Sequence, residues 1–493
     1  MLVRTTNKVI VIERRTNMKK ILMRSGMSPL NNFNPAHIAS TNSIGGNVGN
    51  LVYAYGIYRT LTTEDVMIVP DYYRLNPKDA DMINANYDGY IIPLADAFRP
   101  DFIGHLERYA ELINKLTIPV YVIGVGARTP FDAQKGAKYE FDDATKKFVK
   151  AVLNKSAMIG VRGQITSDYL TGLGFQEGVD HMPIGCPSMY SFGRDLKIRD
   201  TNITKDSLVS INNSRLSPDN VLNFIDRSRH EFGNYYYIPQ WLKELKMTYL
   251  GGPDLPSQNK VYPESVLDEY YTGDHVRYPV NIPTWMELLQ EVDLSFGARL
   301  HGNIAATIAG TPSIILPKDG RMRELTDYHQ LNNYWGPDIT EDTNIWDIIE
   351  QSDFHKPEKV ANENFDRFIG FLNKNNLDHA YKETMYPKTT PFDEKIKNVD
   401  IPGVVTPYVT APIDEQVRRW QAFNDAENAR TERRVKREMA AKKNDAAKIA
   451  AYKQEIERLN KKVKFQENTL NRKAVKATLG LADKVAKLRG NKK

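Results

Sequence analysis

The chain has 493 residues, of which 41% are hydrophobic, and this is enough to bury the cores of about two or three domains. Its single cysteine, Cys186, excludes an intramolecular disulfide framework and is compatible with a reducing compartment. No apolar run approaches the roughly 18–20 residues that cross a bilayer, and the short, charged start of the chain does not resemble a signal peptide. We therefore expect a cytoplasmic protein in which residues 1–17 form an extension before the first strand.

The net charge of +6 conceals a large difference between the tail and the rest of the chain. Residues 430–493 contain 21 Lys and Arg against 7 Asp and Glu, a charge of +14, whereas the remainder has 46 against 54, a charge of −8. This asymmetry predicts a basic arm that binds an anionic surface rather than a basic catalytic body. We expect no specific nucleic acid partner.

Short apolar runs alternate with helical periodicity after Met18, which predicts an α/β protein of βα units with mostly parallel sheets. The first Rossmann-like domain, residues 18–200, is expected to contain strands at Lys20–Ser25, Val66–Pro70, Tyr90–Leu94, Val120–Gly124 and Met158–Val161. A second, residues 201–385, is expected to begin with strands at 208–212 and 235–239 and to end with a helix over Val360–Leu372.

Residues 386–412 contain five prolines, which exclude a continuous helix and predict an extended linker that can pack back across the domains. Residues 413–493 are then expected to form a long charged helix. Apolar residues recur there at two heptad positions: Ile449, Tyr452, Ile456, Leu459, Val463 and Leu470. Gln466 and Lys473 interrupt the second position, so about three heptads favour self-association as a coiled coil.

Three alternatives remain open for the tail. Beyond the heptads, Leu481, Val485 and Leu488 form a narrow apolar stripe among lysines, which suits an interfacial helix on an anionic membrane. Such a helix would place the protein at the inner face of the membrane, and a coiled coil would instead make it an oligomer. A solvated single helix or a disordered basic tail is the third alternative.

The stretch from Ser295 to Leu325 carries the clearest functional pattern. A short strand ends near Phe296, and His301 then falls in the first turn of a helix, next to Arg299. Free backbone N–H groups and the helix dipole favour an anion at such a position. Open α/β sheets bind ligands at these strand-to-helix joints, and an imidazole is suited to general-acid catalysis at neutral pH.

Three features of this stretch resemble the polysaccharide pyruvyltransferase family: Gly297-Ala-Arg-Leu-His301, then Ala309-Gly-Thr-Pro312, then a cationic loop about twenty residues after the histidine. The resemblance implies a fold like that of the two-domain glycosyltransferases of the B type. It also implies that phosphoenolpyruvate donates a pyruvyl group to a saccharide or lipid-linked saccharide, with a pyruvate ketal of a cell-surface polysaccharide as the product.

The same resemblance implies roles for individual residues. Arg162, Arg299 and Arg321 would hold the phosphate and carboxylate of phosphoenolpyruvate, with Lys318 as the alternative to Arg321, and His301 would protonate the donor. Guanidinium groups suit planar oxyanions because they pair with them bidentately.

The family's Asn-x-Gly-Asp loop corresponds to residues 47–50, where Asn47 and Gly49 match as binding residues and Asn50 departs from the family's aspartate. Asp96, Arg99 and Arg128 follow neighbouring strands and are expected at the same edge of the sheet. For Arg99 and Arg128, ordinary surface charges are the favoured interpretation.

No metal site and no cofactor are expected. Asp79 and Asp81 imitate the paired acids of metal-dependent glycosyltransferases, but acids also favour the start of a helix, and the nine histidines show no metal-ligand spacing. Two other functions remain open: a B-type glycosyltransferase that uses a nucleotide sugar, and a non-catalytic assembly protein that acts through its helical tail.

Overall fold

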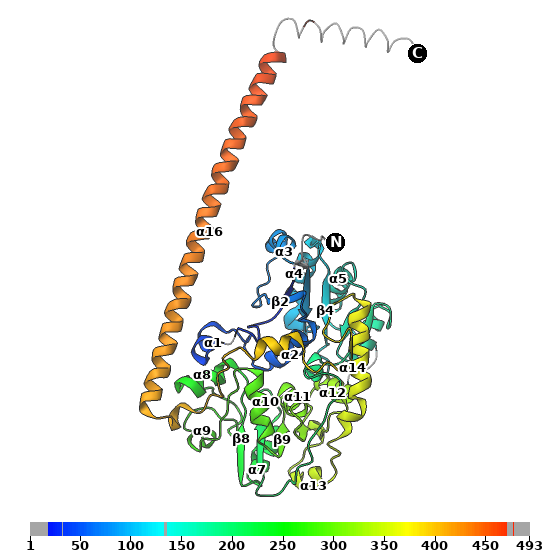
Figure 1. Cartoon of the computed structure of the whole chain (residues 1–493), viewed down its shortest axis with the longest axis vertical. Helices are drawn as coiled ribbons and strands as arrows, with labels where there is room; N and C mark the ends of the chain where they lie inside the picture. The colour runs from blue at the N-terminus through cyan, green and yellow to red at the C-terminus, as the bar shows by residue number, and fades with distance from the viewer. Residues whose placement is uncertain (1–17, 32, 133–135, 471–476, 478–493) are drawn as a thin grey trace, which may run out of the picture. The chain divides into compact units, whose positions relative to one another are not determined.

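The structure is a computed structural model that describes residues 18–31, 33–132, 136–470 and 477. The expected extension at 1–17 and the stripe of Leu481, Val485 and Leu488 lie outside these residues. The chain divides into two compact units, Met1–Asn424 and Asp425–Lys493. The first unit contains both four-stranded parallel sheets (Figure 1).

The first domain is built from alternating strands and helices in this order: β1 (Lys19–Met23), α1 (Pro35–Thr41), α2 (Gly49–Leu61), β2 (Val66–Pro70), α3 (Ala80–Asn86), β3 (Gly89–Pro93), α4 (Ile103–Lys115), β4 (Val120–Ile123), α5 (Asp142–Leu153), β5 (Ile159–Val161), α6 (Gln164–Gly172) and β6 (His181–Pro183). Its main sheet is entirely parallel with strand order β2-β1-β3-β4. Every residue of β3 and β4 is buried, as is typical of parallel strands covered on both faces.

Two further strands extend this sheet. β5 and β6 pair in parallel with each other, and Gly124 and Val125 at the end of β4 donate backbone hydrogen bonds to the carbonyl of Gly160 in β5. The predicted strand at Met158–Val161 therefore lies beside β4, although only this short bridge connects the two sheets.

The second domain repeats the plan in this order: β7 (Leu208–Asn212), α7 (Asp219–Arg229), β8 (Asn234–Tyr237), α8 (Leu242–Leu250), α9 (Glu269–Thr272), α10 (Ile282–Gln290), β9 (Leu294–Gly297), α11 (Leu300–Ile308), β10 (Ser313–Ile315), α12 (Gly320–His329), α13 (Ile345–Glu350) and α14 (Lys356–Lys374). Its sheet is also parallel, with order β10-β9-β7-β8. The expected fold class, two Rossmann-like domains followed by a long helix, is confirmed.

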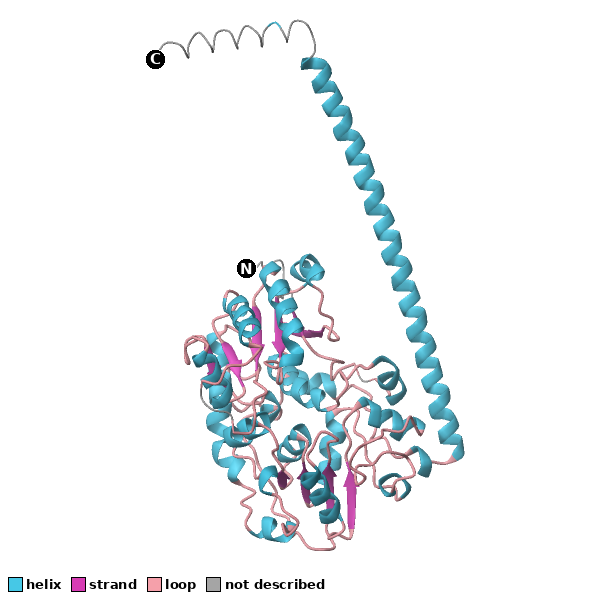
Figure 2. Cartoon of the chain, turned by 180° about the vertical axis from the view of Figure 1, so that it is seen from behind, coloured by secondary structure: helices cyan, strands magenta, loops and turns pink. Residues whose placement is uncertain are grey.

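The two domains share a continuous apolar core. One cluster of buried residues includes Val52 and Ile57 of α2 together with Trp285 of α10 and Ile304 of α11. These helices lie between the two sheets in Figures 1 and 2. The shared core brings the carboxyl ends of both sets of strands toward the same region.

The proline-punctuated segment after α14 packs against both domains. A short helix, α15 (Pro391–Ile396), buries Phe392 in the shared core, and Arg59 of α2 forms an ion pair with Asp393 at 2.7 Å. Farther along, Val405 exchanges two backbone hydrogen bonds with Tyr278. The segment is therefore ordered by tertiary contacts that its prolines do not prevent.

The last helix, α16, runs from Ile413 to Leu470. Its first turns belong to the first compact unit, where Nη1 of Arg419 donates to the carbonyl of Thr406. In the second unit, the heptad residues Ile449, Tyr452, Ile456, Leu459 and Val463 are exposed. Among the described residues, none of the helices has a stretch that is long and apolar enough to cross a membrane.

Candidate functional site

The polar residues of the candidate site lie at the carboxyl ends of the parallel strands. In the first sheet the strand order reverses direction between β1 and β3, and in the second sheet between β9 and β7. Open α/β sheets bind ligands in the crevice that forms at such a reversal. Arg24 and Pro93 mark the crevice in the first domain, and His301 marks it in the second.

Arg162, directly after β5, is a completely buried arginine with free hydrogen-bonding capacity. Its Nε donates to the carbonyl of Gly124 at 3.1 Å, but neither Nη1 nor Nη2 has a hydrogen-bond partner among the described residues. The charge of Arg162 opposes the rise in pKa that burial causes at Glu324, but no carboxylate among the described residues forms an ion pair with the guanidinium. A planar oxyanion would satisfy both terminal nitrogens at once. The carbonyl contact explains how the side chain is held, and it leaves the two terminal nitrogens available.

His301 lies in the first turn of α11, and its Nε2 is likewise buried without a hydrogen-bond partner within the described part of the chain. Its ring and the guanidinium of Arg162 both contact Tyr53: the His301 ring centroid is 6.2 Å from the Tyr53 centroid, and Cζ of Arg162 is 5.5 Å from it. Burial, followed by the charges of Arg162 and Arg321, lowers the pKa of His301 to about 3. The imidazole is therefore neutral at pH 7 in this state.

Arg321, in the first turn of α12, is a half-buried cation whose charge also lowers the pKa of His301. Its Nη1 lies 3.4 Å from Oδ2 of Asp96 and its Nη2 lies 3.5 Å from Oδ2 of Asp319. Both contacts are long, and Nε has no partner among the residues described. Arg321 is thus placed beside His301 by two carboxylates that do not saturate its donors.

Asp96 contacts three arginines, of which Arg321 comes from the second domain. It accepts hydrogen bonds from Arg99 at 2.8 Å and Arg128 at 2.7 Å, in addition to its contact with Arg321. Burial alone would raise the pKa of Asp96, but Arg321, Arg99 and Arg128 outweigh it and hold the pKa well below its usual range. Arg99 and Arg128 are accordingly used to neutralise a buried carboxylate.

Arg299 precedes His301 but has a different environment from Arg162. Its Nη2 forms a buried ion pair with Glu244 at 3.0 Å, its Nε donates to the carbonyl of Asn213, and its Cζ lies 4.8 Å from the Trp241 ring centroid. Two of its nitrogens are therefore used inside the protein. This geometry favours a role in fixing the start of α11 over the direct donor contact that the sequence predicts.

Lys318, the alternative cation in the same loop, is bonded within the second domain. Its Nζ donates to Oγ of Ser217 at 2.6 Å. Burial is the main cause that lowers the pKa of Lys318 to about 7, with Arg299 and Arg321 acting in the same direction and Asp319 opposing them. At neutral pH the ammonium is thus a weaker fixed charge than Arg321, which favours Arg321 as the donor contact.

Asn47 and Gly49 form the turn that begins α2. Oδ1 of Asn47 accepts from the backbone N–H of Gly49 at 2.7 Å, and a Cβ on Gly49 would lie 3.0 Å from Cβ of His301. Glycine therefore allows α2 to approach His301 closely. The side chain of Asn50 donates to the carbonyls of Ile44 and Gly45, which an aspartate could not do. Asn50, which stands where the family has an aspartate, therefore forms hydrogen bonds within the loop.

A cavity of about 30 Å³ lies between His301 and the carboxyl edge of the first sheet. It is lined by residues of both domains: Arg24, Ser25, Asn50, Tyr53, Ala54, Tyr73, Pro93, Ala95 and His301. Sequence reasoning missed Arg24, Tyr53 and Tyr73. The position of Arg24 directly after β1 is a signal that could have found it, whereas a tyrosine within a buried helix carries none.

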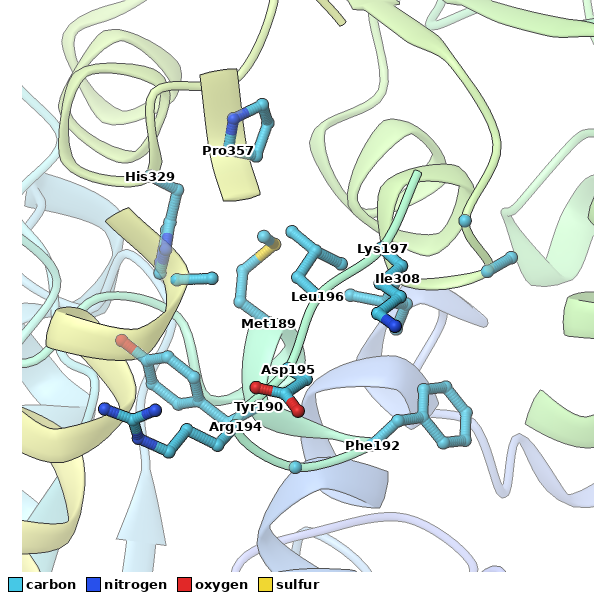
Figure 3. A pocket seen from close by; sticks show the side chains of 14 residues that line it. Met189, Tyr190, Phe192, Arg194, Asp195, Leu196, Lys197, Ile308, His329 and Pro357 are labelled. Carbon is cyan, nitrogen blue, oxygen red and sulfur yellow. The ribbon is translucent and has the colours of Figure 1, made fainter. Parts of the chain in front are cut away.

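A larger cavity of about 230 Å³ lies elsewhere, at the carboxyl end of α11. In Figure 3, Met189 and Leu196 lie between His329 and Ile308 at this cavity. Its buried histidine, His329, already accepts a hydrogen bond from the backbone N–H of Cys186 at 2.8 Å. The candidate site is therefore assigned to the smaller cavity, which is lined by His301 with its unpaired Nε2 and by Tyr53, the ring that Arg162 contacts.

Within the described ranges, no group of three or more His, Cys, Asp or Glu side chains could hold a metal ion. The polar groups that converge around Tyr53 and His301 are instead cations and a neutral imidazole. Such a set is suited to binding an anion.

Two parallel α/β domains with cationic strand ends in the crevice are typical of a class of protein, the two-domain α/β proteins whose ligand sites lie between their domains. The sequence pattern of the family described as "Polysaccharide pyruvyl transferase" matches residues 47–319, which is more than half of the chain. The protein belongs to this family, so it is a transferase whose acceptor is a saccharide.

No curated protein matches the chain. Solved structures that align with it include UDP-GlcNAc 2-epimerase of Methanocaldococcus jannaschii, with 12% identity, 72% of this chain and 99% of that one covered, and a TM-score of 0.42. UDP-N-acetylglucosamine 2-epimerase of Rickettsia bellii has 10% identity, covers 72% and 96%, and has a TM-score of 0.36. MurG of Acinetobacter baumannii has 9% identity, covers 73% and 99%, and has a TM-score of 0.34.

Proposed function

We propose that the protein transfers the pyruvyl group of phosphoenolpyruvate to two hydroxyls of a saccharide, forming a pyruvate ketal and inorganic phosphate. The observation that carries the proposal is the buried guanidinium of Arg162, whose two terminal nitrogens have no partner among the described residues and which flanks Tyr53 together with His301. Arg321 supplies a second cation with an unpaired Nε. Phosphoenolpyruvate carries two anionic groups, and two separated guanidinium groups match them.

The chemistry requires a proton at the methylene carbon of the donor. Once C3 is protonated, C2 becomes electrophilic, and a saccharide hydroxyl adds to C2 and loses its proton. The C2–O bond to phosphate then breaks, and the second hydroxyl adds to C2 and loses its proton in turn. Of the two protons that the hydroxyls lose, one compensates for the proton added to the new methyl group. The other protonates the released phosphate.

His301 is the proposed proton donor to C3. The pKa of about 3 in the unliganded protein results from burial and from the charges of Arg162 and Arg321. A donor that brings a phosphate and a carboxylate to those arginines would neutralise them and favour the imidazolium. Donor binding would therefore charge the imidazole that the reaction needs, so that proton uptake and catalysis are coupled.

Cations that are held in place before the reaction need not move when charge develops on the substrate. Asp96 and Asp319 contribute by holding Arg321 in place. Residues 47 and 49 shape the wall next to His301. We propose that the enzyme acts in the cytoplasm, where phosphoenolpyruvate is available, and that no metal or cofactor takes part.

Thermal unfolding with and without ligands tests the donor. A ligand that binds only the folded state raises the melting temperature by mass action, so millimolar phosphoenolpyruvate should stabilise the protein and should lose this effect with Arg162→Gln. UDP-N-acetylglucosamine provides the comparison. Stabilisation by the nucleotide sugar and none by phosphoenolpyruvate would contradict the proposal in favour of a glycosyltransferase, and stabilisation by neither would favour a non-catalytic role.

A further inference from the structure

The crevice of the first sheet contains a cation that the donor site does not use. The cavity beside His301 is bounded on one side by Arg24 and Ser25, which follow β1, and by Pro93 and Ala95 at the end of β3. This is the point where the strand order of the first sheet reverses, so ligand binding is expected there. Arg162 and Arg321 do not line this cavity.

Arg24 is half-buried at the end of β1, next to Tyr73, Asp71 and Tyr109. Its Nη1 makes a long hydrogen bond of 3.3 Å to the carbonyl of Pro93, and its Cζ lies 4.9 Å from the centroid of the Tyr73 ring. Among the described residues, no carboxylate forms an ion pair with it. Arg24 lines the cavity beside His301, whereas Arg162 and Arg321 are not among the residues that line it.

Tyr73 is held in the cavity by an unusual backbone. Tyr72 and Tyr73 both have left-handed conformations, with φ of 55° and 56°, and such conformations persist in bulky residues only where the surroundings enforce them. Oδ1 of Asp71 enforces this one by accepting from the backbone N–H groups of both Tyr73 and Ser25. Strain of this kind is concentrated at functional sites.

We propose that Arg24 and Tyr73 form the acceptor subsite, and that it binds a saccharide bearing a carboxylate or a phosphate next to His301. The inference rests on the proposed function, because it places the hydroxyls that attack the donor. A sugar ring packs its C–H face on an aromatic side chain, and a few convergent polar groups fix its orientation. Tyr73 provides an aromatic wall on which the guanidinium of Arg24 rests, and that guanidinium, which has no ion pair with a carboxylate among the described residues, provides a bidentate partner for the anionic group.

Ligand-observed NMR titrations in the presence of phosphoenolpyruvate test the subsite with three probes: methyl glucuronide, glucose 1-phosphate and methyl glucoside. We expect the full-length protein to bind at least one anionic probe about tenfold more tightly than the neutral one, because a desolvated charge pair contributes at least this much. Inorganic phosphate alone, as a fourth titration, shows whether the saccharide ring contributes. Equal affinity for charged and neutral probes, or for inorganic phosphate and glucose 1-phosphate, would overturn the proposal.

Three variants assign the effect to the residues. Arg24→Gln should remove the preference for the anionic probe, and Tyr73→Asn, which suits a left-handed backbone, should weaken the binding of all three saccharides. Arg74→Gln is the matched control, because Arg74 is an exposed arginine that lies against Tyr72 instead. Unchanged probe binding in Arg24→Gln would overturn the proposal.

The dissociation constant of phosphoenolpyruvate, measured for the same proteins, separates this inference from the proposed function. It should be unchanged in Arg24→Gln. A loss of donor binding in that variant would overturn the inference by moving Arg24 to the donor site. Wild-type protein that binds no phosphoenolpyruvate would contradict the proposed function itself.

Discussion

Two buried arginines at strand ends, Arg162 and Arg299, have opposite surroundings. Arg299 is neutralised by Glu244 and stacked on Trp241, whereas the terminal nitrogens of Arg162 have no partner among the described residues. The first arrangement is what stability requires of a buried charge. The second destabilises the unliganded protein and is useful only if an anion arrives, which is why we assign donor binding to Arg162.

Replacement of each arginine by methionine should therefore have opposite effects. Arg299→Met leaves the buried carboxylate of Glu244 without its partner and should cost about 3–5 kcal/mol of unfolding free energy. Arg162→Met removes an unpaired charge, so the unliganded protein should be at least as stable as wild type while its stabilisation by phosphoenolpyruvate is lost. Chemical denaturation with and without the ligand measures both. A large loss of stability in Arg162→Met would show that its charge is satisfied within the protein.

His301 should change its protonation when the donor binds. Its pKa of about 3 in the unliganded protein means that the imidazole is neutral at pH 7. A group whose pKa rises on binding takes up a proton, so donor affinity should increase as the pH falls through the pKa of the complex. Calorimetry in two buffers of different ionisation enthalpy should detect this uptake in wild type and a smaller one in His301→Gln. Equal proton uptake by the two proteins would be evidence against the coupling.

The chemical role of the imidazole is tested separately. His301→Asn should keep most of the donor affinity, because the arginines remain, and should lower turnover by about 10²–10⁴-fold, as is typical for loss of a general acid. Phosphate release in the presence of acceptor measures turnover. Normal turnover combined with lower stability would instead make His301 a structural residue at the start of α11.

At the scale of elements, the site depends on how closely α2 approaches α11. A Cβ on Gly49 would lie 3.0 Å from both Cβ of His301 and Oδ1 of Asn47. Gly49→Ala should therefore displace His301 and lower turnover more than stability. Gly104→Ala in α4 is the control, because a Cβ there meets nothing within 4 Å and should stabilise the helix by about 0.5–1 kcal/mol. Unchanged turnover in Gly49→Ala would show that the helices can separate without consequence.

The elements were predictable to the extent that local patterns determine them. The apolar runs at 66–70, 120–124 and 208–212 correspond to β2, β4 and β7, because a strand buried on both faces is continuously apolar. The helix α15 was not foreseen, since Phe392 is ordered by the distant shared core and not by its neighbours in sequence. Prolines at the start of a helix are compatible with it.

The residues of the candidate site were predictable where they directly follow the ends of strands. His301, Arg162 and Arg321 converge because parallel strands present their carboxyl ends on one edge. The pairing of Arg299 with Glu244, which are 55 residues apart, leaves no periodic signature. The contact of Tyr53 with His301 likewise depends on the packing of two helices from different domains, and no pattern in one sequence reports it.

The basic tail is the part of the molecule that we expect to bind an anionic surface. The excess of cations beyond residue 430 gives +14, and each cation near an anionic membrane contributes about 1 kcal/mol, which salt attenuates. We expect the full-length protein to sediment with anionic liposomes at low salt, less at high salt, and not with neutral ones. A chain that ends at Asn424 keeps the contacts of Arg419 with the first compact unit and should not sediment.

Two other outcomes would argue against membrane binding by the tail. Equal sedimentation of both proteins on anionic lipid would exclude membrane binding by the tail. Self-association that resists high salt and is lost in the double variant Ile449→Ser and Ile456→Ser would assign the tail to a coiled coil, because those exposed residues occupy its heptad positions.

The central claim is that an anionic donor binds between Arg162 and His301. A crystal structure of the protein with phosphoenolpyruvate tests it most directly. We predict donor oxygens within about 2.7–2.9 Å of Nη1 and Nη2 of Arg162, with the methylene carbon of the donor facing Nε2 of His301. Phosphoenolpyruvate bound in the cavity beside Met189 and Lys197, with the terminal nitrogens of Arg162 still unpaired, would contradict the account.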